Sequence, residues 1–387
     1  MSIYWNERVK NLSPYVPGEQ PRDRKFIKLN TNENPYPPSP KVIAAFDKAI
    51  AGGNDNTIAA EKADAAGARL RLYPDPACTE LREAIAARYH VKSEQVFAGN
   101  GSDEVLAFAF AAFFNSNTID SNTVGSSAAL PILFPDITYS FYPVYAGLWG
   151  VPFRTIPLVE DFSISIEDYK TDCGGVIFPN PNAPTGLGLP LKSILSIAEY
   201  QKDSNRVVIV DEAYIAFANT PGVESAVPYI DAYPNILTVH TLSKSASLAG
   251  LRVGFAIGNG ELIEGLCRVR DSFNSYTLDR LALAGAAAAV SDVPYYDEIN
   301  NRVIATRERI SAALSAQGFH VIPSSANFIF VKFPNKTGAA AFAALREKGI
   351  LVRHFNKPRI ADYLRVSIGT DAEMDSFLSA CEEIERS

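Results

Sequence analysis

Short apolar runs of strand length recur through the middle of the chain, and they limit its possible folds more than any other feature. They lie at residues 96–98, 129–134, 175–178, 207–210 and 236–239. Stretches with helical spacing fill the gaps between them. A strand that is apolar on both faces needs cover on both faces, and a parallel sheet flanked by helices provides it. The sequence therefore predicts an α/β fold with a mostly parallel sheet.

The second half of the chain changes its pattern after a long helical stretch. Residues 261–290 read as one long helical region, rich in alanine toward its end. The segments after it predict a smaller α+β unit. Its helices are expected at residues 295–316, 337–348 and 371–386, and its strands at 327–332 and 364–368.

The length of 387 residues favours two domains, since single domains usually have ~100–200 residues. Residues 1–30 read as an extended arm that ends in a short strand at 26–29, and residues 52–67 as a loop or a short helix. The expected division has three parts. An arm at 1–40 contributes to the small domain, a large domain occupies 41–275, and the small domain occupies 276–387.

Composition excludes several classes of protein. The net charge is −7, so nothing in the balance suggests a nucleic acid or an anionic membrane as partner. Any anionic ligand must instead be held by a local cluster of arginines. Four cysteines lie far apart without a CxxC pair, and the four histidines lack metal-ligand spacing. The sequence thus predicts no metal site and favours a reducing compartment.

The chain also shows no targeting or membrane segment. Residues 1–15 lack the apolar region of a signal peptide. The longest apolar run, residues 105–114, is about half the ~20 residues that a membrane span needs. We expect a cytoplasmic protein.

The run TLSKSASLAGLR at residues 241–252 carries the strongest chemical signal. It follows an apolar strand and places Lys244 in a loop of small residues. A lysine there can form an imine with an aldehyde cofactor, while Ser243 and Arg252 can hold a phosphate beside it. These are the requirements of pyridoxal phosphate. The alternative, a lysine in a surface loop, leaves the next motif unexplained.

That motif is Asp211-Glu212-Ala213-Tyr214, which closes an earlier strand. Open α/β sheets bind ligands at the carboxyl ends of their strands. A carboxylate at Asp211 can pair with the pyridine nitrogen of the cofactor and keep it protonated. Tyr214 can bond the phenolic oxygen of the same ring. Asp211 alone could equally be a helix N-cap, but together with Lys244 it favours the cofactor.

Three further segments add weaker signals. Gly101, Ser102 and Asp103 open a helix after a strand, which suits a phosphate, although Ser and Asp are also ordinary capping residues. The run NPNAPTG at residues 180–186 is a turn whose asparagine could reach the ring oxygen. Tyr139 could stack on the ring face or belong to the core.

These motifs together carry a resemblance. Their spacing resembles that of the fold-type I pyridoxal-phosphate aminotransferases, and flanking motifs resemble the histidinol-phosphate aminotransferase family. The flanking motifs are YVPGEQ at 15–20, KLNTNENP at 28–35, LYPDP at 72–76 and LRVSIGT at 364–370. The resemblance covers nearly the whole chain.

The resemblance implies a role for each candidate residue. Lys244 would hold the cofactor, Asp211 its ring nitrogen and Tyr214 its ring oxygen. Tyr139 would stack, and the phosphate would be bound by Ser102, Ser243 and Arg252, next to Gly101 and Asp103. Relatives often have asparagine before Pro-Thr-Gly, where this chain has Ala183, so we expect Asn182 to be the second partner of the ring oxygen.

The resemblance also implies a dimer and a substrate. Tyr73 would reach the cofactor phosphate of the neighbouring subunit. Arg365, Arg353, Tyr15 and Asn34 would face the substrate. The implied reaction moves an amino group between L-histidinol phosphate and 2-oxoglutarate in histidine biosynthesis. A guanidinium pairs well with carboxylate or phosphate, and a second one at Arg353 suits the more highly charged phosphate.

Three alternatives remain open at this point. An aromatic amino acid aminotransferase would need Arg365 but not Arg353. A phospho-amino-acid decarboxylase of the same fold would release carbon dioxide and need no 2-oxoglutarate. A transcription regulator with this fold would need an added DNA-binding module, and the chain has no spare basic N-terminal domain.

Overall fold

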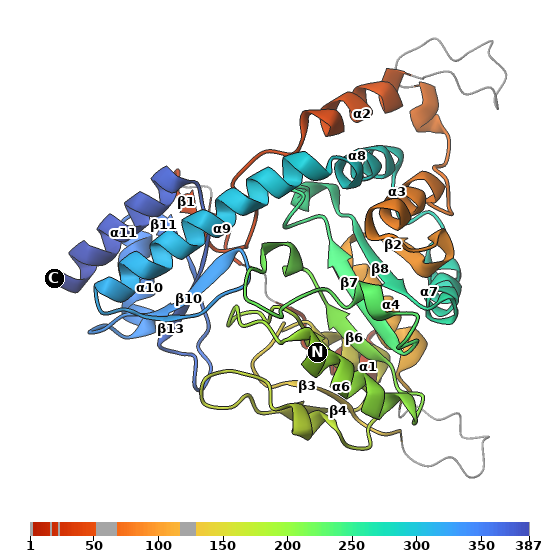
Figure 1. The fold of residues 1–387 in the computed structure, drawn as a ribbon, viewed down its shortest axis with the longest axis horizontal. Coiled ribbons are helices and arrows are strands. Elements are labelled where there is room, and N and C mark those ends of the chain that lie inside the picture. Colours follow the sequence, from red (N-terminus) through yellow and green to blue (C-terminus); the bar gives the residue numbers. More distant parts are fainter. Residues whose placement is uncertain (1–2, 16–17, 22–23, 52–67, 117–128, 387) are drawn as a thin grey trace.

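The computed structural model describes residues 3–15, 18–21, 24–51, 68–116 and 129–386 (Figure 1). The loop or short helix expected at 52–67 lies outside the described residues, as do two residues of the 15–20 motif. Within the described part, no helix has both the length and the apolar character to cross a membrane.

A seven-stranded sheet forms the centre of the larger unit, in the order β2-β8-β7-β6-β5-β3-β4. All neighbours pair in parallel except β8, which is antiparallel to β2 and β7. The strands are β2 (Val96–Gly99), β3 (Ile132–Pro135), β4 (Phe153–Ile156), β5 (Gly175–Pro179), β6 (Val208–Asp211), β7 (Ile236–Thr241) and β8 (Gly254–Gly258). The prediction of an α/β fold with a mostly parallel sheet is confirmed.

Helices cover both faces of this sheet because successive side chains of its strands point to opposite sides. Ile209 packs in one apolar cluster with α4 (Gly101–Phe113), α5 (Tyr142–Trp149) and α7 (Gly260–Phe273). Its neighbours Val208 and Val210 pack in another cluster, with α3 (Thr79–Tyr89), α6 (Leu191–Lys202) and α8 (Arg280–Ser291). The central strands are therefore buried on both faces.

The single helix expected at residues 261–290 is wrong. The chain forms two helices, α7 and α8, separated by residues 274–279. The carboxylate of Asp279 accepts hydrogen bonds from the backbone N–H groups of Leu281 and Ala282, which caps a new helix at this point. Helix α8 then packs against α3 and α2 (Pro40–Ala51), on the side of the large sheet (Figure 1). The domain boundaries themselves stay a prediction.

The smaller unit contains an antiparallel sheet in the order β12-β13-β10-β9. Its strands are β9 (His320–Ile322), β10 (Phe328–Lys332), β12 (Arg353–His354) and β13 (Tyr363–Ser367). The accompanying helices are α9 (Val293–Ala316), α10 (Gly338–Glu347) and α11 (Asp371–Arg386), and α9 runs from α8 to this unit (Figure 1). Strand β1 (Ile27–Lys28) of the arm pairs in parallel with β11 (Ile350–Leu351). The arm is thus tied to the small unit by backbone hydrogen bonds.

Short elements complete the described part. They are α1 (Glu7–Lys10) and 3₁₀ turns at Ala68–Arg71, Ser93–Gln95, Ile166–Tyr169, Ile215–Phe217, Val227–Tyr229 and Ala249–Leu251. The last of these lies within the lysine loop, between β7 and β8, and brings Arg252 back to the sheet.

Candidate active site

A cavity of about 160 Å³ lies at the carboxyl ends of β5, β6 and β7, where Pro179, Asp211 and Thr241 end their strands. Eight of the residues singled out from the sequence line it: Ser102, Asp103, Tyr139, Asp211, Tyr214, Ser243, Lys244 and Arg252. They come from segments far apart along the chain. Their convergence follows from the parallel sheet, which brings the loops after its strands to one edge.

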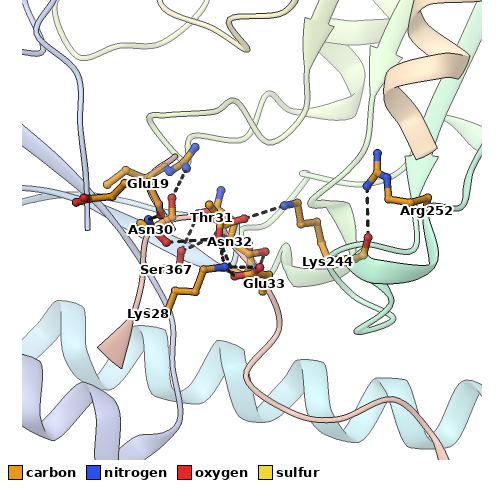
Figure 2. Close-up of polar contacts among 12 residues, drawn as sticks. Glu19, Lys28, Asn30, Thr31, Asn32, Glu33, Lys244, Arg252 and Ser367 are labelled. Carbon is orange, nitrogen blue, oxygen red and sulfur yellow. Dashed lines mark hydrogen bonds and ion pairs between the residues drawn. The ribbon is translucent and has the colours of Figure 1, made fainter. Parts of the chain in front are cut away.

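Lys244 lies in this cavity and is partly buried. Its Nζ donates a hydrogen bond to the backbone carbonyl of Thr31 at 3.0 Å (Figure 2). Burial lowers the pKa of the Lys244 amine to about 8, and the nearby Arg365 guanidinium acts in the same direction. An amine with such a pKa can become a neutral nucleophile or base close to neutral pH.

Asp211 is the buried carboxylate of the site. The Tyr142 hydroxyl donates to its Oδ2 at 3.1 Å, and the backbone N–H of Ala213 donates to its Oδ1 at 3.2 Å. Burial raises the pKa of Asp211 to about 6. A cationic partner would stabilise the ionised form, because a buried carboxylate lacks the solvation that water would supply. A protonated pyridine nitrogen is such a partner.

The start of α4 forms a cradle that fits a phosphate. Gly101 has a φ of +76°, and a Cβ there would lie 2.5 Å from Nη2 of Arg252. The backbone N–H groups of a helix N-terminus and an adjacent guanidinium together attract an anion. Arg252 Nη2 donates to Asp103 Oδ2 at 3.0 Å, and Ser243 Oγ lies 3.0 Å from Oγ1 of Thr241. The left-handed φ requires glycine here, and a Cβ would in addition displace the Arg252 guanidinium.

We expect the Gly101→Ala variant to bind pyridoxal phosphate about tenfold more weakly. A left-handed non-glycine residue costs about 1–2 kcal/mol, and the methyl group would also displace the Arg252 guanidinium. A fluorescence titration of cofactor-free protein with pyridoxal phosphate measures the change. Gly147→Ala is the matched control, since a Cβ at this exposed position meets nothing within 4 Å. Equal affinities of the two variants would contradict the cradle.

Two arginines of the small unit are expected to face the substrate, but neither lines this cavity, and Arg353 lines a separate pocket with Glu19 and Asn30. Arg353 and Arg365 are Cα partners on the antiparallel strands β12 and β13. Their guanidinium groups lie 5.5 and 5.6 Å from the centre of the Phe355 ring. Burial lowers the pKa of Arg365, whose Nη2 donates to the carbonyl of Asn30 at 3.1 Å. Its Nε is buried without a hydrogen-bond partner in the described residues, so the group has a donor available for an anion.

The aromatic residues proposed for the site have different surroundings. Tyr15 stacks on Phe141 with ring centres 4.2 Å apart. Tyr139 donates its hydroxyl proton to Oδ1 of Asp103 at 2.7 Å. Tyr73 lies outside the cavity: 77% of its surface is exposed, and it stacks on Tyr276.

Two asparagines expected in the site have their side chains engaged elsewhere. Both hydrogens of the Asn182 amide are used, one on the Ile137 carbonyl and one on Oγ1 of Thr185, each at 3.0 Å. Its oxygen accepts from Thr138. Ala183 lines the cavity instead, with its methyl group. The Asn34 amide donates to Asn300 on α9 at 3.3 Å. The geometry therefore offers neither amide to a ligand in the cavity.

Four residues of the site escaped the reasoning from sequence. Thr31 and Glu33 line the cavity, Asn32 bonds Tyr214, and Tyr142 bonds Asp211. The first three belong to KLNTNENP, which was noticed only as a flanking motif. Figure 2 shows this segment and Lys244 facing one another. Tyr142 had a usable signal, since tyrosines at positions 139, 142 and 145 recur with helical spacing.

Comparison with known proteins identifies the fold and the family of the chain. A solved structure of the histidinol-phosphate aminotransferase from Sinorhizobium meliloti, in complex with pyridoxal-5'-phosphate, superposes with a TM-score of 0.83. It is 22% identical and covers 100% of this chain and 98% of its own. The fold is that of the fold-type I aminotransferases. The model of the family "Aminotransferase class I and II" matches residues 24–380, and the chain belongs to this family.

Relatives of higher identity share the full length. The histidinol-phosphate aminotransferase of Clostridium acetobutylicum is 52% identical over 383 residues, covering 99% of each chain. Histidinol-phosphate aminotransferase 2 of Dechloromonas aromatica is 51% identical over 385 residues, again covering 99% of each chain.

Proposed function

We propose that this chain is a pyridoxal-phosphate-dependent aminotransferase that acts in histidine biosynthesis. It moves an amino group between L-histidinol phosphate and 2-oxoglutarate, which gives imidazole acetol phosphate and L-glutamate. The convergence of Lys244, Asp211 and Arg252 on one cavity carries the proposal of the cofactor and chemistry. The full-length likeness to enzymes named for this substrate supports the choice of amine.

The residues of the cavity fit the cofactor part by part. Lys244 would hold its aldehyde carbon, Asp211 its ring nitrogen and Tyr214 its ring oxygen. The phosphate would lie at the start of α4, between Ser102, Ser243 and Arg252. When bound, pyridoxal phosphate supplies an electron-withdrawing ring next to the carbon that changes its amino group.

Lys244 is the residue that would transfer the proton. Once its amine is free, Nζ can take the proton from the amine-bearing carbon of the substrate and return it on the cofactor side. The Thr31 carbonyl, 3.0 Å from Nζ, orients the amine. The Asp211 carboxylate would keep a proton on the pyridine nitrogen. Binding of glutamate or 2-oxoglutarate at the same site then completes a ping-pong cycle.

The two arginines of the small unit suit the anionic ends of both substrates. Histidinol phosphate has a phosphate and no carboxylate, whereas its partner 2-oxoglutarate has carboxylates alone. Arg365 can serve either anion because its guanidinium is buried and its Nε has no hydrogen-bond partner among the residues that the structure describes. Arg353, its Cα partner on β12, would add a second positive charge for the phosphate. The chain as a whole is acidic, so this local pair matters for anion binding.

We expect the Arg353→Gln variant to raise the KM for histidinol phosphate by roughly 10- to 100-fold, with a smaller effect on 2-oxoglutarate. The loss of one charged hydrogen bond to phosphate costs about 1.5–3 kcal/mol. Steady-state kinetics with each substrate varied in turn measures the two effects. Arg359→Gln is the control, since this exposed arginine contacts Asp136 and Val159 outside the cavity. An unchanged KM for histidinol phosphate would favour the aromatic aminotransferase.

The proposed enzyme is a cytoplasmic homodimer. The exposed ring of Tyr73, outside the cavity of its own chain, supports a role in the neighbouring subunit. Tyr73 would then contact the cofactor phosphate of the partner. Sedimentation velocity of the purified protein tests the dimer.

The substrate is tested by a half-reaction. Purified, cofactor-loaded protein is mixed with histidinol phosphate or with phenylalanine, without 2-oxoglutarate, and the visible absorbance of the lysine-bound cofactor is followed. Rapid conversion to the aminated cofactor by histidinol phosphate alone is the expected result. Conversion by phenylalanine alone would assign the chain to the aromatic aminotransferases. Release of carbon dioxide from a phospho-amino acid would assign it to the decarboxylases.

A further inference from the structure

Asn32 of the arm is buried beside the cavity in an unusual backbone conformation. It is 1% exposed and has a left-handed φ of 57°. Its Nδ2 donates to the Tyr214 hydroxyl at 3.0 Å, and its backbone carbonyl accepts from Asn327 at 3.0 Å. Ser367 on β13 bonds it twice (Figure 2). Contacts from three segments of the chain thus hold this residue, and two of these segments, at Tyr214 and Ser367, contact its side chain.

The side-chain amide of Asn32 lies between two hydroxyl groups, those of Ser367 and Tyr214. The backbone N–H of Asn32 donates to Oγ of Ser367 at 2.8 Å, so that hydroxyl is an acceptor there. Its own hydrogen is then donated to Oδ1 of Asn32 at 3.0 Å. With Oδ1 turned to Ser367, Nδ2 must face Tyr214. In this orientation the amide donates to the phenol oxygen of Tyr214 and accepts from the hydroxyl of Ser367.

This direction decides where the phenol proton of Tyr214 can go. Because the oxygen accepts from Asn32, its hydrogen is left for another acceptor, and Tyr214 lines the cofactor cavity. The other phenol in the cavity wall, Tyr139, donates to Asp103. The position before Pro-Thr-Gly presents only the methyl group of Ala183. Tyr214 is thus the phenol best placed to donate to a ring oxygen.

We propose that Asn32, held by Ser367, is a positioning residue that directs the O–H of Tyr214 into the cavity, toward the ring oxygen of the cofactor. Ser367 lies two residues from Arg365 on β13, so both side chains leave the same face of the strand. Arg365 bonds the carbonyl of Asn30, and Ser367 bonds Asn32. The strand that carries the substrate arginine therefore also holds the residue that orients Tyr214.

The test uses the visible absorbance of the lysine-bound cofactor as a function of pH, without substrate. The lysine nitrogen and the ring oxygen of the bound cofactor share a proton. A hydrogen bond donated to the ring oxygen withdraws negative charge from it, so the shared proton is lost at a lower pH. Loss of a directed donor should therefore raise the pH midpoint of the absorbance change. We expect Asn32→Gly to raise the midpoint by about one pH unit, which corresponds to about 1.4 kcal/mol of lost stabilisation of the charged oxygen.

Glycine is the chosen replacement because it adopts the left-handed conformation without strain and adds no charge. The groups that also influence this titration stay in place: Arg365, Asp211 and Tyr15 around Tyr214, and Glu33, Asp103 and Arg252 around Lys244. Asn205→Gly is the matched control. Asn205 also has a left-handed φ, of 53°, but it is exposed and precedes the start of β6, at the end of the strand away from Asp211. Ser367→Ala should raise the midpoint by a smaller amount. Its control, Ser376→Ala at an exposed position on α11, should leave the midpoint unchanged.

A double substitution separates positioning from a general loosening of the site. In a Tyr214→Phe background the phenol is gone, so Asn32→Gly should leave the midpoint unchanged. An equal shift with and without the phenol would overturn the proposal, as would an unchanged midpoint in the single variant. The inference rests on the proposed cofactor but not on the proposed amine, since no substrate is present. If the parent enzyme showed no visible absorbance of lysine-bound cofactor, the result would instead count against the proposed function.

Discussion

Replacement of Lys244 by alanine is expected to lower kcat/KM for histidinol phosphate by about four orders of magnitude. General acid–base catalysis by a positioned side chain contributes ~10²–10⁴-fold, and Lys244 would also supply the attachment of the cofactor. The partly buried amine, with its pKa lowered to about 8, is the only lysine that lines the described cavity. Stopped-flow and steady-state assays of cofactor-loaded protein measure the loss.

The matched control is Lys192→Ala, which removes an exposed lysine from α6. This variant should keep the parental rate and the parental absorbance of lysine-bound cofactor. Lys244→Ala should retain the circular dichroism of the parent but lack that absorbance. A near-normal turnover rate of the Lys244→Ala variant would contradict the mechanism proposed for the chain.

Asp211→Asn is expected to lower kcat by roughly 10²–10³-fold with little change in KM. The amide keeps the size of the carboxylate but cannot balance a positive charge on the pyridine nitrogen, and the loss of one preorganised electrostatic partner has an effect of this order. The ring then withdraws electrons less strongly when the substrate proton leaves. Single-turnover kinetics with histidinol phosphate isolates this step.

Tyr142→Phe provides a graded comparison for Asp211. It removes the hydrogen bond from the phenol to Oδ2 of Asp211 but leaves the carboxylate in place. We expect a fall in kcat of about tenfold, in line with ~1–1.5 kcal/mol for one hydrogen bond. A larger effect of Tyr142→Phe than of Asp211→Asn would contradict the assignment of the charge to Asp211.

The fold could be predicted from sequence because its central strands are buried on both faces. Runs such as residues 175–178 and 207–210 contain no polar residue and so required helices on each side. The break between α7 and α8 was missed because residues 274–279 contain no Gly or Pro to mark it. Asp279, whose side chain caps α8, was the available signal for a second helix start.

The site was predictable where a motif ends a strand. Lys244, Asp211 and Arg252 lie at or near strand ends, so the parallel topology alone brings them together. The contacts of Thr31 and Asn32 depend on how the arm folds back between the two units, and no periodicity in the sequence encodes that path. The expectation for Asn182 came from a relative's motif rather than from the geometry of this turn, in which Thr185 and Ile137 engage the amide.

The measurement that tests the central claim most directly is the location of the bound cofactor. The purified protein is loaded with pyridoxal phosphate, reduced with borohydride to make the bond to lysine permanent, digested, and analysed by peptide mass spectrometry. The account predicts that the added mass lies on Lys244, in the peptide that contains residues 241–252. Attachment to another lysine, such as Lys28 beside Glu33 in the arm, would contradict it.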